Sequence, residues 1–445
     1  MNVVRWTISL SVVALCAAPA LAQSAVQSAF DYNLASCDSA CEPECACEPE
    51  CACEADCACE ADCCCEPSCG CDSGCCDSGH DWGCLGDCCL GDPCTLQEHL
   101  TPCCSDYSYG GWVALGYYTD PTRFSTQSGE LLSFNDYPDH LNLTQAWVYF
   151  EKTASPTACS ADYGYRFDML YGTDAQKTQA FGNPLNQFGT PRGWDNPWDN
   201  GVYGWAIPQL YGEVAYGDWS VKAGHFFTLI GYEVVPAPDN FFFSHALTMF
   251  NAEPFTHTGV VATYSGMDDV TLYAGWTLGW DTGFDQFSGG NSWLGGVSFN
   301  ATDDVVFTYM STAGNLGWRS NGQDGYSQSL VGTVAVSDSL EYVAQSDYVQ
   351  TNSSFYAIGF NQYLFYTLND CWKAGGRIEW FKTDSFSPDE SASFYEATVG
   401  LNYKPHANVV VRPEVRWDWT NAEGTAGVPA NYDETVFGID AIFTF

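Results

Sequence analysis

Charged side chains recur at alternate positions of short apolar runs, a spacing that points to a water-filled pore. In the run 411–419, apolar residues alternate with Arg412, Glu414, Arg416 and Asp418. Because a β-strand has a period of two, these four side chains fall on one face. Basic and acidic groups on facing walls order polar solutes and select ions. We expect twelve side chains to line such a pore: Arg166, Asp168, Glu213, Lys373, Arg377, Glu379, Glu396, Arg412, Glu414, Arg416, Asp418 and Asp440.

Four basic members of this set lie on two nearby predicted strands, and with Lys404 on the strand between them they could form one basic wall: Lys373, Arg377, Arg412 and Arg416. The acids are spread more widely, and from Ser105 onward 38 acidic residues stand against 13 basic ones. This excess favours the entry of cations, although it equally suits solubility in salt or cation bridging at the outer surface. The alternative for each charge is that it pairs across neighbouring strands and only solvates the lumen.

Motifs for other chemistry are absent from the sequence. No Gly-x-Ser-x-Gly elbow and no His-Glu-x-x-His occurs, so nothing supports a hydrolase, and no basic patch with interleaved aromatics supports nucleic-acid binding. Glu233 and His257 lie on one loop, but two ligands are too few for a metal site, and we interpret them as loop-packing residues. We therefore expect no enzyme, no cofactor, no metal and no nucleic-acid partner.

These charges must be positioned by strands, and from residue 105 onward the chain has short runs bounded by Gly, Asn, Asp and Pro, with no convincing helical period. Long and short connections alternate, as in an up-and-down outer-membrane barrel with short periplasmic turns. Two connections depart from this rule: the eleventh is short, and the second, 152–162, is longer than a tight turn. The sixteen predicted strands begin near Gly111, Leu141, Tyr163, Ile207, Trp219, Thr258, Val270, Ser292, Asp304, Tyr326, Leu340, Ser353, Trp372, Phe394, Asn408 and Asp433.

The faces of these strands favour lipid over a protein core. A Lys or Arg that faces lipid at mid-depth costs about 2 to 4 kcal/mol, so the charged faces must point inward and the apolar faces outward. The predicted fold for 105–445 is an all-β, transmembrane, up-and-down antiparallel barrel of about 16 strands. The strand near Leu141 fits less well, because Gln145 shares a face with Trp147 and Tyr149. A soluble sandwich or lectin-like domain, with its charges outward, is the alternative.

The first 22 residues have the pattern of a secretory signal peptide. Arg5 precedes an apolar run, and Ala20, Leu21 and Ala22 form a small-x-small cleavage site. Cys16 raises the alternative of lipoprotein processing, although the bulky Leu15 before it argues against that. No later run holds eighteen apolar residues, so no transmembrane helix is predicted. We expect an outer-membrane protein of a diderm bacterium, in contact with outer-membrane lipid.

Residues 23–104 form an acidic, cysteine-rich, low-complexity segment that we expect in the periplasm. Of the 24 cysteines, 21 lie between residues 37 and 104, and 17 acids with no Lys or Arg lie between residues 31 and 98. Removing Cys16 leaves an odd number, which suggests a disulfide-linked envelope partner or homo-oligomer. A soft-metal or divalent-cation sponge is the rival hypothesis. Cys159 and Cys371 lie in predicted periplasmic connections, so either could form a disulfide with the segment.

The chain ends on a strand whose aromatic face closes with Phe443 and Phe445. A terminal aromatic residue on the lipid face of the last strand resembles the signal by which outer-membrane barrels are recognised for assembly. We therefore expect these two residues to act in assembly.

Two connections, 172–206 and 228–257, are long. The first could fold into the lumen as a constriction or cover the barrel mouth, and the sequence does not decide between the two. The second, with its flanks, has a distinctive motif: Gly224 and Phe226, then Gly231, Tyr232 and Glu233, then Asn240, Phe243 and Ser244, then His257 and Gly259. This pattern resembles the putative β-barrel porin-2 family of planctomycete-type outer-membrane proteins, with His225 standing where a basic residue is commoner. The resemblance spans about residues 105–445, and it implies a porin-like outer-membrane barrel whose solute is unassigned.

We therefore expect a porin that lets small polar solutes or ions diffuse passively, with a preference for cations. A barrel of sixteen strands is wide enough for an aqueous channel. The alternative is a structural or adhesive outer-membrane barrel with a plugged lumen, cross-linked to the envelope through its cysteine-rich segment.

Overall fold

The structure is a computed structural model that describes residues 88, 90–97, 106–119, 134–135, 137–156, 160–180, 194–195, 198–284, 290–317, 322–352, 355–384, 391–420 and 432–445. The predicted signal peptide, most of the predicted cysteine-rich segment and Cys159 lie outside these residues.

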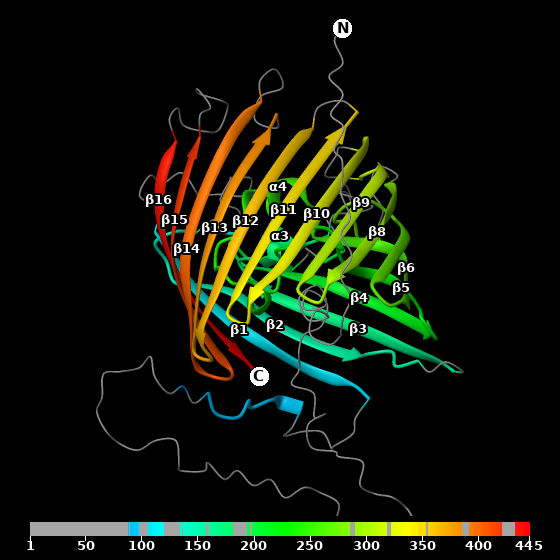
Figure 1. The fold of residues 1–445 in the computed structure, drawn as a ribbon, viewed down its shortest axis with the longest axis horizontal. Coiled ribbons are helices and arrows are strands. Elements are labelled where there is room, and N and C mark those ends of the chain that lie inside the picture. Colours follow the sequence, from blue (N-terminus) through cyan, green and yellow to red (C-terminus); the bar gives the residue numbers. More distant parts are fainter. Residues whose placement is uncertain are drawn as a thin grey trace, which may run out of the picture.

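Sixteen antiparallel strands form one closed barrel (Figure 1). Each strand pairs with its neighbours in sequence, and β1 pairs with β16 to close the ring. Closure leaves no free sheet edge, which is the condition for β-structure in lipid. The predicted fold is confirmed, and every strand begins within three residues of its expected start. The strands are β1 (Ser108–Tyr118), β2 (Asn142–Lys152), β3 (Ala161–Gly172), β4 (Gly204–Tyr216), β5 (Trp219–Phe227), β6 (Thr256–Met267), β7 (Val270–Thr277), β8 (Asn291–Thr302), β9 (Val305–Asn315), β10 (Asp324–Ser337), β11 (Leu340–Thr351), β12 (Tyr356–Asn369), β13 (Trp372–Thr383), β14 (Ala392–His406), β15 (Val409–Thr420) and β16 (Asp433–Thr444).

The two faces of the strands differ as the alternation requires. On β13, Ile378 points outward and is 54% exposed, whereas its neighbours Arg377 and Glu379 point inward and are 1% and 5% exposed. Val399 on β14 and Phe437 on β16 are likewise exposed on the outer surface. An outer surface of large apolar side chains is what a bilayer stabilises and water does not.

Connections at one end of the barrel are tight. Six of them, at 217–218, 268–269, 303–304, 338–339, 370–371 and 407–408, contain two residues each. The connection after β2, at 153–160, is longer, and the one after β11, at 352–355, is short, as the sequence predicted. The C-terminus lies at the end with the tight turns (Figure 1).

The structure explains why the sequence of β2 departs from the expected alternation of an apolar outer face and a polar inner face. Gln145, Trp147 and Tyr149 all face the interior and are at most 8% exposed, while Val148 and Phe150 face outward. The indole rings of Trp147 and Trp112 stack with their centroids 4.6 Å apart. This part of the inner wall is therefore aromatic, because it packs against a segment of chain inside the barrel rather than against water.

The closing seam reaches the last residue. The Phe445 N–H donates to the Gly111 carbonyl at 2.9 Å, and the Gly111 N–H donates to the Phe445 carbonyl at 3.1 Å. The C-terminal residue thus extends the pairing of β16 with β1.

A short piece of the predicted cysteine-rich segment is attached to the tight-turn end. Cys88 forms a disulfide with Cys371, in the turn between β12 and β13. The Ala407 N–H donates to the Leu90 carbonyl at 2.9 Å. The Asn408 side chain accepts from the Cys94 N–H at 2.6 Å and donates to the Cys94 carbonyl at 2.9 Å. Two neighbouring turns therefore hold this segment. Within the described residues, no helix has the length and apolar character needed to cross a membrane.

Candidate functional site

The connection between β5 and β6, residues 228–255, folds into the barrel, and we call it the inserted loop. It contains the 3-10 helix η3 (Ala237–Asp239) and the helix α4 (Leu247–Ala252). Figure 1 shows α4 inside the ring of strands, where it contacts β11, β12 and β13. The shorter helix α3 (Ala175–Thr178) follows β3 and contacts β3 and β4. The sequence did not predict that this loop enters the lumen. Of the connection 172–206, which it offered as a constriction or a cover of the barrel mouth, residues 181–193 and 196–197 lie outside the described residues.

The inserted loop has its own internal hydrogen bonds. The Asn240 side chain accepts from the Val234 N–H at 3.0 Å and donates to the Val234 and Pro236 carbonyls at 2.5 and 3.0 Å. Gly231 has φ +94°, and a Cβ there would overlap the Glu253 carboxylate. An amide that satisfies three backbone groups and a glycine that no side chain can replace give this loop a single shape.

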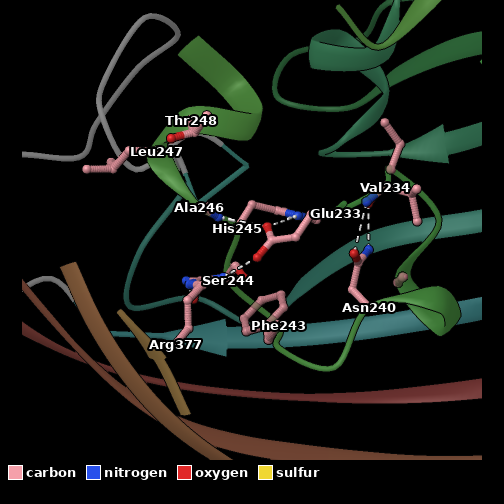
Figure 2. Close-up of polar contacts among 12 residues, drawn as sticks. Glu233, Val234, Asn240, Phe243, Ser244, His245, Ala246, Leu247, Thr248 and Arg377 are labelled. Carbon is pink, nitrogen blue, oxygen red and sulfur yellow. Dashed lines mark hydrogen bonds and ion pairs between the residues drawn. The ribbon is translucent and has the colours of Figure 1, made fainter. Parts of the chain in front are cut away.

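Glu233 joins the inserted loop to the barrel wall (Figure 2). Its carboxylate accepts from the Arg377 guanidinium at 2.7 Å, the Ala246 N–H at 2.8 Å and the Tyr363 hydroxyl at 3.1 Å, and lies 3.3 Å from His245. Burial would raise the pKa of Glu233, but the Arg377 charge, His245 and the Ala246 N–H lower that pKa to about 2. The carboxylate is therefore charged throughout the physiological range.

Three arginines of the wall bind carbonyl groups of the inserted loop. Arg377 donates to the Ser244 carbonyl at 2.9 Å and pairs with Glu396 at 2.8 Å. Arg412 donates to the carbonyls of residues 237 and 240 at 2.8 and 2.6 Å, and pairs with Asp440 at 2.6 Å. Arg416 donates to the carbonyl of residue 245 at 2.5 Å and pairs with Asp418 at 2.7 Å. Each buried guanidinium is thus both ion-paired and bound to the loop, as buried charge requires.

Carboxylates of the wall bind N–H groups of the same loop. Glu414 accepts from residues 243 and 244 at 2.9 and 3.0 Å, and Glu379 accepts from residues 247 and 248 at 2.6 and 2.7 Å. Asp281, in the connection after β7, accepts from residue 255 of the loop and from residue 256 of β6 at 2.6 and 2.9 Å. Gln145 both donates to the carbonyl of residue 235 and accepts from the N–H of residue 237. Irregular backbone inside the barrel is satisfied in this way by the wall.

The twelve sequence-predicted pore residues therefore differ in surroundings. Arg377, Arg412, Arg416, Glu379 and Glu414 bind the inserted loop, while the ion pairs engage Glu396, Asp418 and Asp440. On the opposite wall, Arg166 pairs with Asp168 at 2.7 Å and Glu151 at 2.6 Å, and Glu213 is hydrogen-bonded to Ser220. Lys373 lies 3.6 Å from Glu341. A role of these twelve in solute selection stays a prediction.

A cavity of about 550 Å³ lies between the inserted loop and the wall, and it reaches the tight-turn end of the barrel. Of the twelve predicted residues, Lys373 and Arg412 line it, together with Lys404. Cys371, the partner of Cys88 in the disulfide, also lines it. The cavity is large enough for a small organic molecule.

Five residues of the family motif place the inserted loop, and two of its glycines lie on the strands that flank the loop. The five are Gly231, Glu233, Asn240, Ser244 and His257, and the two glycines are Gly224 and Gly259. Gly224 has φ +138°, and a Cβ there or at Gly259 would meet the neighbouring strand's backbone. The carbonyl and hydroxyl oxygens of Ser244 accept hydrogen bonds from the Arg377 guanidinium. The His257 ring bonds the Gly279 carbonyl at 3.1 Å and the Thr228 hydroxyl at 3.1 Å. Gly231, Glu233 and Asn240 act as described above, so the motif specifies the loop and its attachment.

Metal-ligand clusters are not found in the described ranges, where no group of three or more His, Cys, Asp or Glu side chains could hold an ion. Glu233 and His257 have separate partners within the loop and at its ends.

Sequence reasoning missed Asp281, Tyr363 and the binding role of Gln145. The only available signal was Gln145 itself, a polar residue that breaks the expected face pattern of its strand. Asp281 has φ +49° in a connection, and nothing in its sequence context reveals that it caps the far end of the inserted loop.

A family model described as "Putative beta-barrel porin-2, OmpL-like" matches residues 106–445. The chain belongs to this family. The family resemblance expected from the loop motif is thereby confirmed. Comparison with curated protein sequences gave no match.

Solved structures of outer-membrane proteins are similar to this chain at low sequence identity. An anion-selective porin from Comamonas acidovorans has a TM-score of 0.51 at 9% identity, covering 76% of this chain and 99% of that one. A trimer form of OmpT, an outer-membrane protein of Vibrio cholerae, has a TM-score of 0.49 at 11% identity, with 76% and 99% covered. The channel DcaP of Acinetobacter baumannii has a TM-score of 0.47 at 13% identity, with 76% and 97% covered. At these identities the likeness concerns the fold alone.

Proposed function

We propose that this porin-family barrel is an outer-membrane porin through which small polar solutes or ions diffuse passively. The observation that carries the proposal is a closed sixteen-stranded barrel whose lumen keeps a cavity of about 550 Å³ beside the inserted loop. The strands satisfy their own backbone and face lipid with apolar side chains, so the interior is free to hold water. Passage needs no reacting group, and the proposal assigns none.

In this proposal the inserted loop sets the width of the passage. It is held by side chains from both halves of the barrel, including Gln145 on β2 and Arg377 on β13. A loop that is bound on several sides narrows the lumen by a fixed amount. Such a constriction excludes large solutes at all times rather than opening and closing.

The test of passive diffusion is swelling of liposomes that contain the purified, folded protein. We expect small sugars to enter at rates that fall steeply with solute size. Equal rates in protein-free and protein-containing liposomes would contradict the proposal.

A preference for cations among inorganic ions forms part of the proposal. It is supported by the excess of acids, 38 against 13 basic residues from Ser105 onward, because net charge near a pore attracts counter-ions. The reversal potential in a potassium chloride gradient measures this directly. An anion-selective potential would overturn the preference and leave the porin proposal standing.

We place the barrel in the outer membrane of a diderm bacterium, with lipid around its apolar surface. The predicted periplasmic position of the cysteine-rich segment is supported by the disulfide of Cys88 with the tight turn at Cys371, because porin turns of this kind face the periplasm. A cross-link from this segment to an envelope partner or a second copy is also part of the proposal. Non-reducing electrophoresis of intact envelopes tests it, and a purely monomeric band would contradict it.

The second candidate is a structural or adhesive barrel with a plugged lumen. One observation favours it: the inserted loop packs its own apolar side chains against the inner wall at Trp112 and Trp147. Unchanged permeability in the swelling assay, from protein that is correctly folded, would favour this candidate over the porin.

A further inference from the structure

We propose that the cavity contains a subsite for small aromatic carboxylates, with the carboxylate held by Lys373 and Lys404 and the ring placed against Phe241. The proposal rests on the porin function and deepens it, since it names a class of solute that the passage retains on its way through.

Lys373 and Lys404 differ from the other basic residues of the lumen. Arg377, Arg412 and Arg416 are at most 3% exposed and are each bound to a carboxylate and to the inserted loop. The Lys373 side chain is 37% exposed, and among the described residues its ion pair is with Glu341, 3.6 Å away. A lysine at that distance keeps donors free for a second acceptor.

Lys404 is the less constrained of the two. Its side chain is exposed and lines the cavity. Among the residues that the structure describes, the Lys404 ammonium group has no ion-pair or hydrogen-bond partner. Lys373 pairs with Asn402 in the register of β13 and β14, so Lys404 lies two residues farther along β14 on the same inward face. Two ammonium groups on neighbouring strands thus border the same end of the cavity.

Aromatic side chains lie directly beside these lysines. The Lys373 ammonium is 4.9 Å from the centre of the Phe365 ring and 6.0 Å from that of Phe241. Phe365 is buried, whereas Phe241 and Tyr232 of the inserted loop are only partly buried and line the cavity. The Phe241 ring, supported by Phe365 at 4.9 Å, therefore presents an apolar face to solutes.

Asn402 supplies a further polar group at the same place. It lines the cavity between the two lysines, and its buried Oδ1 accepts no hydrogen bond from the described residues. Buried polar atoms are normally paired, so an unpaired acceptor in a cavity wall is suited to a donor from solvent or from a bound molecule. A ring hydroxyl on the solute would supply such a donor.

Together these groups select for a particular chemistry. Small polar solutes would gain nothing from the Phe241 face, and inorganic anions would use the lysines alone. An organic cation with its ring against Phe241 would be repelled by the positive charge of Lys373. A carboxylate joined to a flat ring can bind both the lysines and the Phe241 ring. This binding depends on a few neighbouring side chains, whereas the preference among inorganic ions depends on the net charge around the whole pore entrance.

The test measures binding without requiring conduction. Benzoate is titrated against the full chain in lipid nanodiscs, and saturation-transfer NMR reports the dissociation constant. The Lys373→Met/Lys404→Met double variant is expected to weaken binding by about tenfold or more, because charged hydrogen bonds are lost. Phe365→Leu and Phe241→Leu are each expected to weaken it by about twofold to tenfold. Cyclohexanecarboxylate is expected to bind less tightly than benzoate.

The matched control is Lys222→Met. Lys222 is another lumen lysine over an aromatic ring, 4.2 Å from the centre of Tyr211, but it lies outside this cavity. It is expected to leave benzoate binding unchanged, and heat-modifiable electrophoretic mobility shows that each variant is folded. Absence of saturable binding to the natural protein, equal binding by the double variant, or equal competition by phenyltrimethylammonium would overturn the proposal. Conductance is recorded separately, so a conducting barrel that does not bind benzoate refutes the subsite and leaves the porin function standing.

Discussion

Arg377 is the residue on which the attachment of the inserted loop most depends. It is 1% exposed and lies between Glu233 of the loop and Glu396 of β14, at 2.7 and 2.8 Å. Because Arg377 alternates with the apolar Ile378, the sequence placed the Arg377 side chain on the inner face of the barrel, where the structure has it. The pairing with a loop more than a hundred residues away has no local signal, because strand periodicity records only which face a side chain occupies.

We expect Arg377→Met to destabilise the folded barrel by about 3 to 5 kcal/mol, since it leaves two buried carboxylates without their cation. Urea unfolding of the protein in lipid vesicles measures this change. The matched control is Lys382→Met on the same strand, which should change stability by less than about 0.5 kcal/mol. A loss from Arg377→Met as small as that of the control would show that the loop is not held by this contact.

At the scale of elements, the strands and their order followed from the sequence, and the inserted loop did not. A period of two and short turns specify strands and their neighbours, so all sixteen were predicted. The sequence offered the connection 172–206 as a constriction or a cover of the barrel mouth, and it assigned no position to the connection 228–257. The course of residues 228–255 depends on groups from β2, β13 and β15 that meet only after the barrel closes.

Replacing residues 236–246 with two glycines is expected to widen the lumen and raise single-channel conductance by about twofold or more, because conductance follows the cross-section of the narrowest part. The control replaces residues 385–391, in the connection between β13 and β14, with two glycines. This change should leave conductance unchanged. Equal conductance in both variants would exclude the inserted loop as the constriction.

The disulfide at the tight-turn end is an element-scale feature that the sequence predicted in part. Lys and Arg are absent between Arg5 and Arg123, so trypsin leaves the cysteine-rich segment in one peptide ending at Arg123. Under non-reducing conditions we expect mass spectrometry to find this peptide joined to the one that ends at Lys373. Cys371→Ser should abolish the link, and Cys94→Ser should preserve it. A Cys371 peptide recovered as a free thiol would contradict the structure.

For the whole molecule, closure depends on the pairing of β1 with β16 up to the final residue. The predicted assembly role of Phe443 and Phe445 belongs to this scale. Phe443 is 42% exposed on the outer surface of the closed barrel, which is the face that the prediction requires.

Deleting residues 443–445 is expected to leave the protein unassembled, because both the terminal aromatics and the last hydrogen bonds of the seam are lost. Fractionation of cells and heat-modifiable mobility measure the outcome. Substituting Thr444→Ser, which preserves both aromatics, is the control. Normal amounts of heat-modifiable barrel in the outer membrane after the deletion would contradict the assembly role.

The central claim is that a barrel narrowed by its inserted loop still conducts. Planar-bilayer recording of the purified, folded, full-length protein tests it most directly. We predict stepwise increases in current as single barrels insert, and a larger step when residues 236–246 are replaced. Absence of steps from folded full-length protein, with steps from the variant, would show that the inserted loop plugs the barrel and would contradict the porin function.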